Sequence, residues 1–128
     1  IKLSLRWFES ALYGKGGIDA YLKYWFAIET LGMPSTTNIR PLVESLSRAY
    51  GISHEEAQQK FSIGRLFGLR SRIVHEGQII SVHQNLTKYI EALYVDVLLE
   101  HLGLASEHRA EDVIDDPNFD LARYLYEP

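Results

Sequence analysis

Two arginines and a histidine lie close together in a short segment of this chain, at Arg70, Arg72 and His75. Arginine presents a planar fork of donors that matches phosphate oxygens. Histidine, with an unperturbed pKa of about 6.5, gains or loses a proton near neutral pH. These groups together could bind an anion and transfer a proton. A lone histidine at a helix end more often interacts with the helix dipole, so both interpretations stay open.

Arg70 occupies an unusual position for a charged residue. On a helical wheel of about 100° per residue it falls in the middle of an apolar arc. That arc contains Leu66, Phe67, Ile73 and Val74. A charge in such a place is costly unless it is paired or faces a ligand, so Arg70 needs a partner.

Glu29 occupies the same kind of position in an upstream segment. The apolar arc there contains Ile18, Leu22, Trp25 and Phe26. We therefore predict that Glu29 and Arg70 meet between the two helices. Such a pair either locks the register of two helices or orients Arg70 for catalysis, and the sequence leaves both uses open.

His75 follows Arg70 by five residues, so the two side chains point well apart on one straight helix. Arg72 and His75 are three residues apart and share a face. Two arrangements would unite Arg70 and His75 in one site. Either His75 lies on a terminal turn before Gly77, or a second copy of the chain supplies the partner across a two-fold axis.

The elements that must position these residues are helices, because helical periodicity dominates the chain and no alternating pattern indicates a strand. We expect helices at residues 3–13, 19–31, 41–50, 53–75 and 84–102, the fourth with a break near residues 62–64. Ser53 and Glu56 form a capping box at the start of the fourth helix. Short connections predict an all-α, antiparallel bundle of four to five helices.

The domain organisation follows from the same pattern. Residues 1–104 should form the bundle, and residues 105–128 an acidic C-terminal extension that packs on the bundle or on a partner. Within this extension, the pattern of residues 119–126 predicts one or two weak helical turns.

Composition excludes several classes of protein. The chain has 128 residues, no cysteine and a formal net charge of −4. The absence of cysteine excludes disulfide scaffolds and thiolate metal sites, and the net charge argues against a broad nucleic-acid-coating surface. No apolar run approaches the ~20 residues of a membrane span. We expect a cytoplasmic domain without a membrane partner. The first residue is Ile1 rather than methionine, which fits a part of a longer protein.

Two segments together resemble one known family. Residues 67–75 read FGLRSRIVH, and residues 24–31 read YWFAIETL. The first resembles the R-x4-6-H motif of HEPN domains (higher eukaryotes and prokaryotes nucleotide-binding), with four residues between Arg70 and His75. Both segments resemble the Apea-like branch, and the likeness spans residues 3–102. Glu76 departs from the glycine that often follows the histidine directly.

The resemblance implies a helical bundle that dimerises with its Arg/His motifs facing each other. It implies a metal-independent, cofactor-free endoribonuclease in a defence or toxin–antitoxin context, with an antitoxin or further domains as partners. Arg70 and His75 would be catalytic, and Glu29, Ser71 and Arg72 would support them or bind phosphate. RNA would be cleaved by attack of the 2′-hydroxyl on the adjacent phosphate. The alternative is a HEPN-like interaction or dimerisation module without catalysis.

Overall fold

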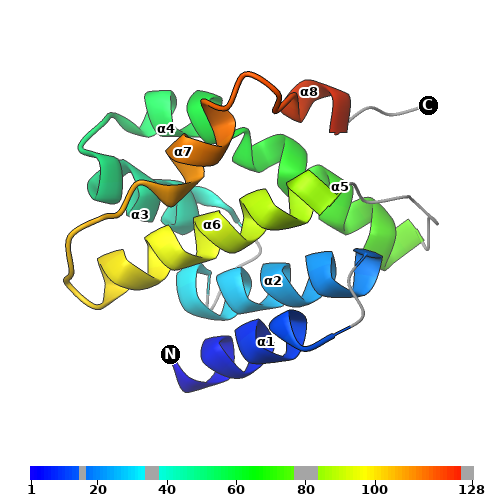
Figure 1. Ribbon diagram of the computed structural model, residues 1–128. Helices are drawn as coiled ribbons and strands as arrows, with labels where there is room; N and C mark the ends of the chain where they lie inside the picture. Colours follow the sequence, from blue (N-terminus) through cyan, green and yellow to red (C-terminus); the bar gives the residue numbers. More distant parts are fainter. Residues whose placement is uncertain (15–16, 34–37, 77–83, 125–128) are drawn as a thin grey trace.

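The computed structural model describes residues 1–14, 17–33, 38–76 and 84–124, and within them the chain is all-helical with no strand (Figure 1). The helices are α1 (Lys2–Leu12), α2 (Gly17–Gly32), α3 (Arg40–Tyr50), α4 (His54–Phe61), α5 (Ile63–Glu76), α6 (Gln84–His101), α7 (Arg109–Ile114) and α8 (Leu121–Tyr124). The prediction of an all-α fold is confirmed. No helix of the described ranges has the length and apolar character to cross a bilayer.

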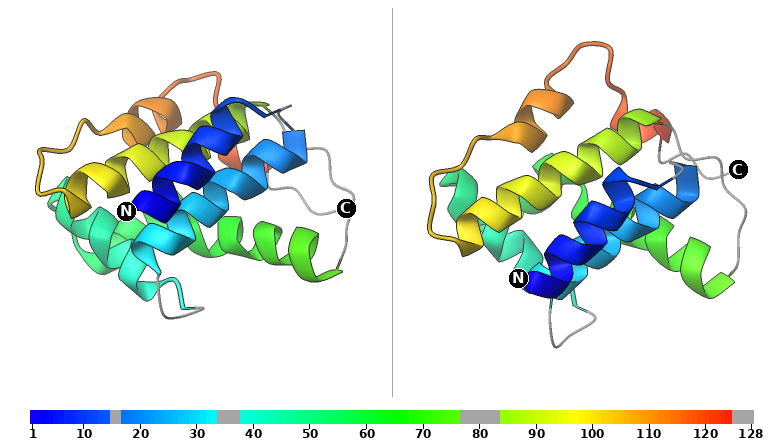
Figure 2. Two further views of the ribbon diagram at one scale, coloured as in Figure 1. Left: turned by 90° about the horizontal axis from the view of Figure 1, so that it is seen from below. Right: turned by 60° about the horizontal axis from the view of Figure 1, so that its bottom comes forward.

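Helices α2 and α6 form the centre of the molecule. α1 runs antiparallel to α2 along one side, while α3 and α7 pack against α6 (Figures 1 and 2). Both central helices carry buried side chains on more than one face, which is why they are covered from several directions. The largest fully buried side chains of the core are Trp25, Tyr21, Tyr89, Tyr94 and Phe61.

The expected break in the fourth predicted helix is present at Ser62. This residue adopts a left-handed backbone conformation, with φ of 52°, and separates α4 from α5. Its backbone N–H still donates to the carbonyl of Gln58 at 3.1 Å, so the turn caps α4. At the other end of α4, the Ser53 hydroxyl accepts from the backbone N–H of Glu56 at 3.1 Å, as predicted.

The C-terminal extension contains more structure than the sequence indicates. α8 lies within the predicted weak turns, but α7 was not expected, and it packs on α6 with Ala110 fully buried. The expected bounds of the other helices agree with the structure to within two residues, apart from the division at Ser62.

Candidate functional site

Glu29 of α2 and Arg70 of α5 form an ion pair, as predicted from the two helical wheels. Arg70 Nε lies 2.6 Å from Glu29 Oε1, and Arg70 Nη2 donates a hydrogen bond of 3.0 Å to Glu29 Oε2. The side chains are only 14% and 20% exposed. One hydrogen bond and one close charge contact thus hold the guanidinium against the carboxylate.

Aromatic rings surround the guanidinium of Arg70. Its Cζ atom lies 5.9 Å from the ring centre of Phe26 and 5.7 Å from that of Phe67, within the range of cation–π attraction. Phe26 in turn meets Trp7 of α1 edge-on at 5.0 Å, and Phe67 meets Trp25 at 6.1 Å. The arginine is therefore held by three helices through a mixture of charge and ring contacts.

A second contact ties α5 to α2 close to this pair. The hydroxyl of the buried Tyr21 donates to the carbonyl of Leu66 at 3.3 Å. Burial raises the pKa of Tyr21 well above its ordinary value, and a hydrogen bond with Trp25 and the positive charge of Arg72 offset this in part. Arg72 thus lies within electrostatic reach of the α2–α5 contact.

The remaining predicted site residues occupy the same helix. Ser71 and Arg72 are half-buried in α5, whereas Val74 is 40% exposed. The backbone of His75 belongs to the last turn of α5, and its side chain lies outside the described part of the structure. The predicted convergence of Arg70 and His75 therefore also lies outside it.

A shallow depression of about 420 Å³ opens beside the ion pair and is lined by Leu3, Glu29, Thr30 and Met33. The Thr30 hydroxyl donates to the carbonyls of Phe26 and Ala27 on its own helix. The depression therefore offers the carboxylate of Glu29 as its charged group. The contacting atoms Glu29 Oε1 and Arg70 Nε are themselves buried.

The described residues include no group of three or more histidine, aspartate or glutamate side chains that could hold a metal ion. The chemistry that the described site can perform is electrostatic. It presents an arginine that is fixed in place and partly neutralised by a carboxylate.

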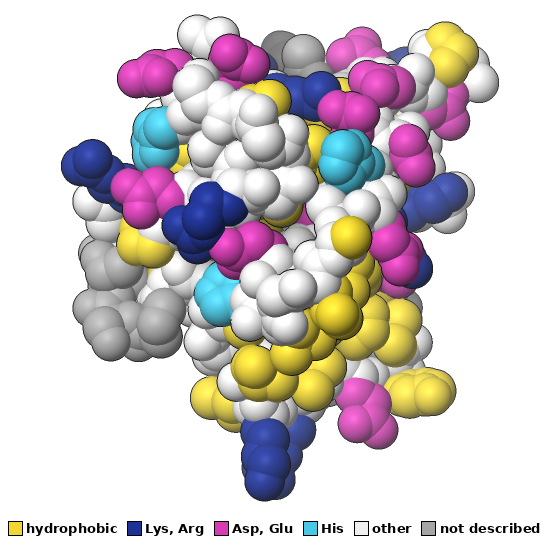
Figure 3. All heavy atoms as spheres, turned by 90° about the vertical axis from the view of Figure 1, so that its left-hand side faces the viewer, with side chains coloured by type: hydrophobic (Ala, Val, Ile, Leu, Met, Phe, Trp, Pro, Cys, Tyr) yellow, Lys and Arg dark blue, Asp and Glu magenta, His cyan; other side chains and the backbone are white. Residues whose placement is uncertain are grey.

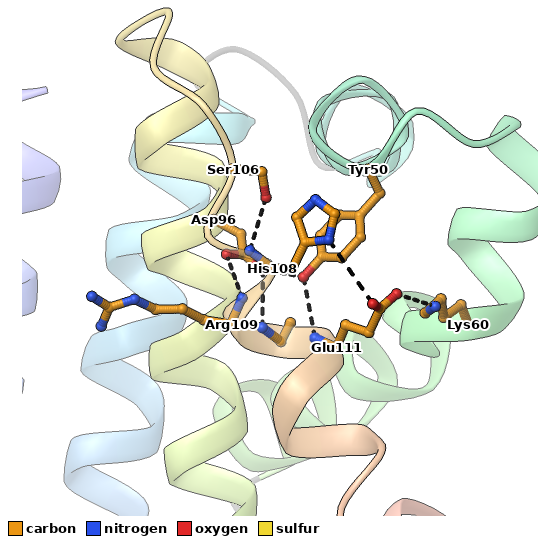
Figure 4. Close-up of polar contacts among 8 residues, drawn as sticks. Tyr50, Lys60, Asp96, Ser106, His108, Arg109 and Glu111 are labelled. Atoms are coloured by element: carbon orange, nitrogen blue, oxygen red, sulfur yellow. Dashed lines mark hydrogen bonds and ion pairs between the residues drawn. The ribbon is translucent and has the colours of Figure 1, made fainter.

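A polar network that the sequence did not predict lies around the second half of α6 (Figure 4). Asp96 is fully buried and accepts hydrogen bonds of 3.0 Å from the backbone N–H groups of Arg109 and Ala110. These groups belong to the first turn of α7. The carboxylate therefore caps α7 from a different helix, where a negative charge also interacts favourably with the helix dipole.

Tyr50 extends this network to α3. Its hydroxyl donates to Asp96 Oδ2 at 2.5 Å and accepts from the backbone N–H of Glu111 at 3.1 Å. Burial and the hydrogen bond to Asp96 raise the pKa of Tyr50 far above its ordinary value. His108 stacks on the Tyr50 ring, and Lys60 pairs with Glu111 (Figure 4).

The signal for this network was present in the sequence. Asp96 interrupts an apolar run between Val95 and Val97, in the same way as Glu29 and Arg70 interrupt theirs. Besides the Tyr50 hydroxyl, its partners are backbone groups of a six-residue helix, which no side-chain pattern reveals.

No family model, curated protein or solved structure matches this chain significantly.

Proposed function

We propose that this chain is a metal-independent endoribonuclease domain of HEPN type that cleaves RNA at a composite Arg/His site. Arg70 and His75 are the catalytic residues of the proposal. Glu29 positions Arg70, and Ser71 and Arg72 contact the RNA backbone. The proposal further places the domain in a cytoplasmic defence or toxin–antitoxin system, with an antitoxin or further domains of a longer chain as partners.

The observation that supports this proposal is the Glu29–Arg70 ion pair. The two segments that resemble the family, residues 24–31 and 67–75, are far apart in sequence and meet through this contact. The rings of Trp25 and Phe67 meet at the same place. A tertiary contact between the two segments is what a shared site requires.

The proposed reaction is an internal transfer of the phosphoryl group. A base removes the proton of the 2′-hydroxyl, the 2′-oxygen forms a bond to the adjacent phosphorus, and the bond from phosphorus to the 5′-oxygen breaks. The 5′-oxygen receives a proton from an acid, which leaves a 2′,3′-cyclic phosphate and a 5′-hydroxyl. His75 acts as the base or the acid, and Arg70 stabilises the charge on the phosphoryl oxygens.

The helical geometry indicates that one protomer does not provide the whole site. Positions 70 and 75 lie about 140° apart around α5 on an ideal helix. A homodimer in which the arginine of one protomer meets the histidine of the other removes this difficulty. The 40% exposed Val74, between the two positions, provides an apolar contact for such an interface.

The decisive experiment is cleavage of labelled single-stranded RNA in excess EDTA by the wild type, Arg70→Ala and His75→Ala. We expect cleavage by the wild type, 2′,3′-cyclic phosphate ends, and loss of activity in both variants. The matched control is Arg65→Ala, because Arg65 is an exposed arginine on the same helix. RNA left intact by a folded wild-type protein, or equal activity in all variants, would contradict the proposal.

The second candidate is a non-catalytic interaction module, and one observation favours it. The carboxylate of Glu29 lies 2.6 Å from Arg70 and neutralises it, while Phe26 and Phe67 lie close to the guanidinium. In this interpretation the pair only locks α2 against α5. The double variant Glu29→Leu/Arg70→Met separates the two candidates, because a module would keep its fold and partner binding whereas a ribonuclease would lose activity.

A further inference from the structure

One side of the molecule presents apolar side chains to solvent along α1 and the end of α6. We call it the α1–α6 face and define it by Leu5, Leu12, Leu98 and Leu102. Leu5, Leu12 and Leu102 are 42%, 49% and 48% exposed. Figure 3 shows hydrophobic side chains gathered in a band on the lower half of this side, with basic side chains below them.

The contacts of α1 place these leucines beside α6. On the inner side of α1, Ser4 Oγ lies 3.0 Å from the Tyr94 hydroxyl, and Phe8 stacks on the Tyr94 ring at 4.8 Å. Leu5 and Leu12 lie next to Phe8 on the helical wheel, toward solvent. Leu98 and Leu102 follow Tyr94 along α6 at spacings of four and eight residues, and so continue the same side.

The exposed leucines are not needed to hold α1 in place. The buried Ser4 and Ala11, with Phe8 and Trp7, already make the contacts of α1 with α2 and α6. A cluster of half-exposed leucines on one side of a domain is typical of an interaction surface.

Charges around the face are arranged in a self-complementary order. Lys2 and Arg6 are exposed in the first half of α1, and Glu9 is exposed in the second half. None of the three forms an ion pair with another described residue. The face is therefore positive at one end and negative at the other.

We propose that the α1–α6 face binds a second copy of this chain, with the two α1 helices antiparallel about a two-fold axis. In that arrangement Arg6 of each copy meets Glu9 of the other, and Leu5 and Leu12 are buried between them. A two-fold contact requires a self-complementary patch, which this charge order provides.

This contact is separate from the proposed catalytic site. On the helical wheel Leu5 and Leu12 lie on the opposite flank of α1 from Trp7. Trp7 contacts Phe26, and Phe26 contacts Arg70. A dimer through the α1–α6 face leaves Arg70 outside the interface, so the inference does not depend on ribonuclease activity.

The first test measures self-association of the whole chain by sedimentation velocity over a range of concentrations. We expect a wild-type dimer, and a dissociation constant raised at least about tenfold in Leu5→Gln/Leu12→Gln. The control is Leu3→Gln, because Leu3 is 55% exposed on α1 but lies on the Trp7 flank of the helix, opposite Leu5 and Leu12. A monomeric wild type overturns the proposal. So does a dimer that Val74→Gln disrupts and Leu5→Gln/Leu12→Gln leaves intact, and that result assigns the dimer to the proposed catalytic face.

The second test examines the two-fold arrangement by charge reversal. Arg6→Glu should weaken the dimer, and Arg6→Glu/Glu9→Arg should restore it, since the reversed face is again complementary to itself. Circular dichroism of each monomer checks that α1 stays helical. Equal dissociation constants for the wild type and Arg6→Glu, or no recovery in the double variant, overturn the antiparallel contact.

Discussion

The hydroxyl of Tyr50 donates a hydrogen bond of 2.5 Å to the buried carboxylate of Asp96, and so joins α3 to α6. The same carboxylate accepts from the first backbone N–H groups of α7. One aspartate thus satisfies donors from two other elements. Its burial is tolerated because each oxygen has a partner, and the charge is placed at a helix N-terminus.

Asp96→Asn should detach α7 from the bundle. An amide has one acceptor oxygen and carries a donor where the N–H groups of α7 need an acceptor, so we expect a loss of about 2–4 kcal/mol in the free energy of unfolding. Urea unfolding measures the loss, and hydrogen exchange should locate it in α7. Asp115→Asn is the control, since Asp115 is exposed at the other end of α7. Equal stability of the two variants would show that Asp96 does not hold the helix.

Removing one member of the Glu29–Arg70 pair should cost more than removing both. Glu29→Leu leaves the guanidinium without its carboxylate, and we expect a loss of about 3–5 kcal/mol. Glu29→Leu/Arg70→Met replaces both charges by apolar groups and should recover most of that loss. The measurement is a double-mutant cycle by chemical unfolding. Additive effects of the two substitutions would contradict a direct coupling.

Alkaline pH should unfold the protein as its buried tyrosines ionise. Burial, and secondarily the charge of Glu91, raises the pKa of Tyr24 from 10.0 to about 12, and the pKa of Tyr50 rises further. Because the folded pKa values exceed the unfolded one, their contribution is fully present below about pH 10 and is lost as the pH rises above it. Absorbance at 295 nm and circular dichroism should therefore change together. Ionisation of all 8 tyrosines near pH 10 with full helicity would disprove this.

Ser62→Gly should stabilise the protein, because Ser62 has a φ of 52° that a residue with a Cβ adopts at a cost. We expect a gain of up to about 1 kcal/mol in the free energy of unfolding, and a loss for Ser62→Val of about 1–2 kcal/mol. Thermal unfolding of the three proteins is sufficient to measure this. An unchanged melting temperature in Ser62→Val would mean that residue 62 does not keep its left-handed backbone conformation.

The sequence predicted the central contact of the candidate site because burial leaves a readable pattern. Glu29 and Arg70 each interrupt an apolar arc, and two uncompensated charges on helices of one small bundle have few partners other than each other. The sequence could not predict where His75 acts. Five residues along an ideal helix place the side chains of Arg70 and His75 about 140° apart. Whether a second copy of the chain brings the two residues together depends on assembly, which no local pattern reveals.

Apart from the Glu29–Arg70 contact, what the sequence determined by itself was local. Helical periodicity, the cap at Ser53 and the break near residues 62–64 follow from short-range sterics and hydrogen bonds, so their signals lie within a few residues. The tertiary structure alone decided that α7 exists and where it packs. A six-residue helix is too short to be stable by propensity, and the carboxylate that caps it comes from Asp96, 13 residues before Arg109 in the chain.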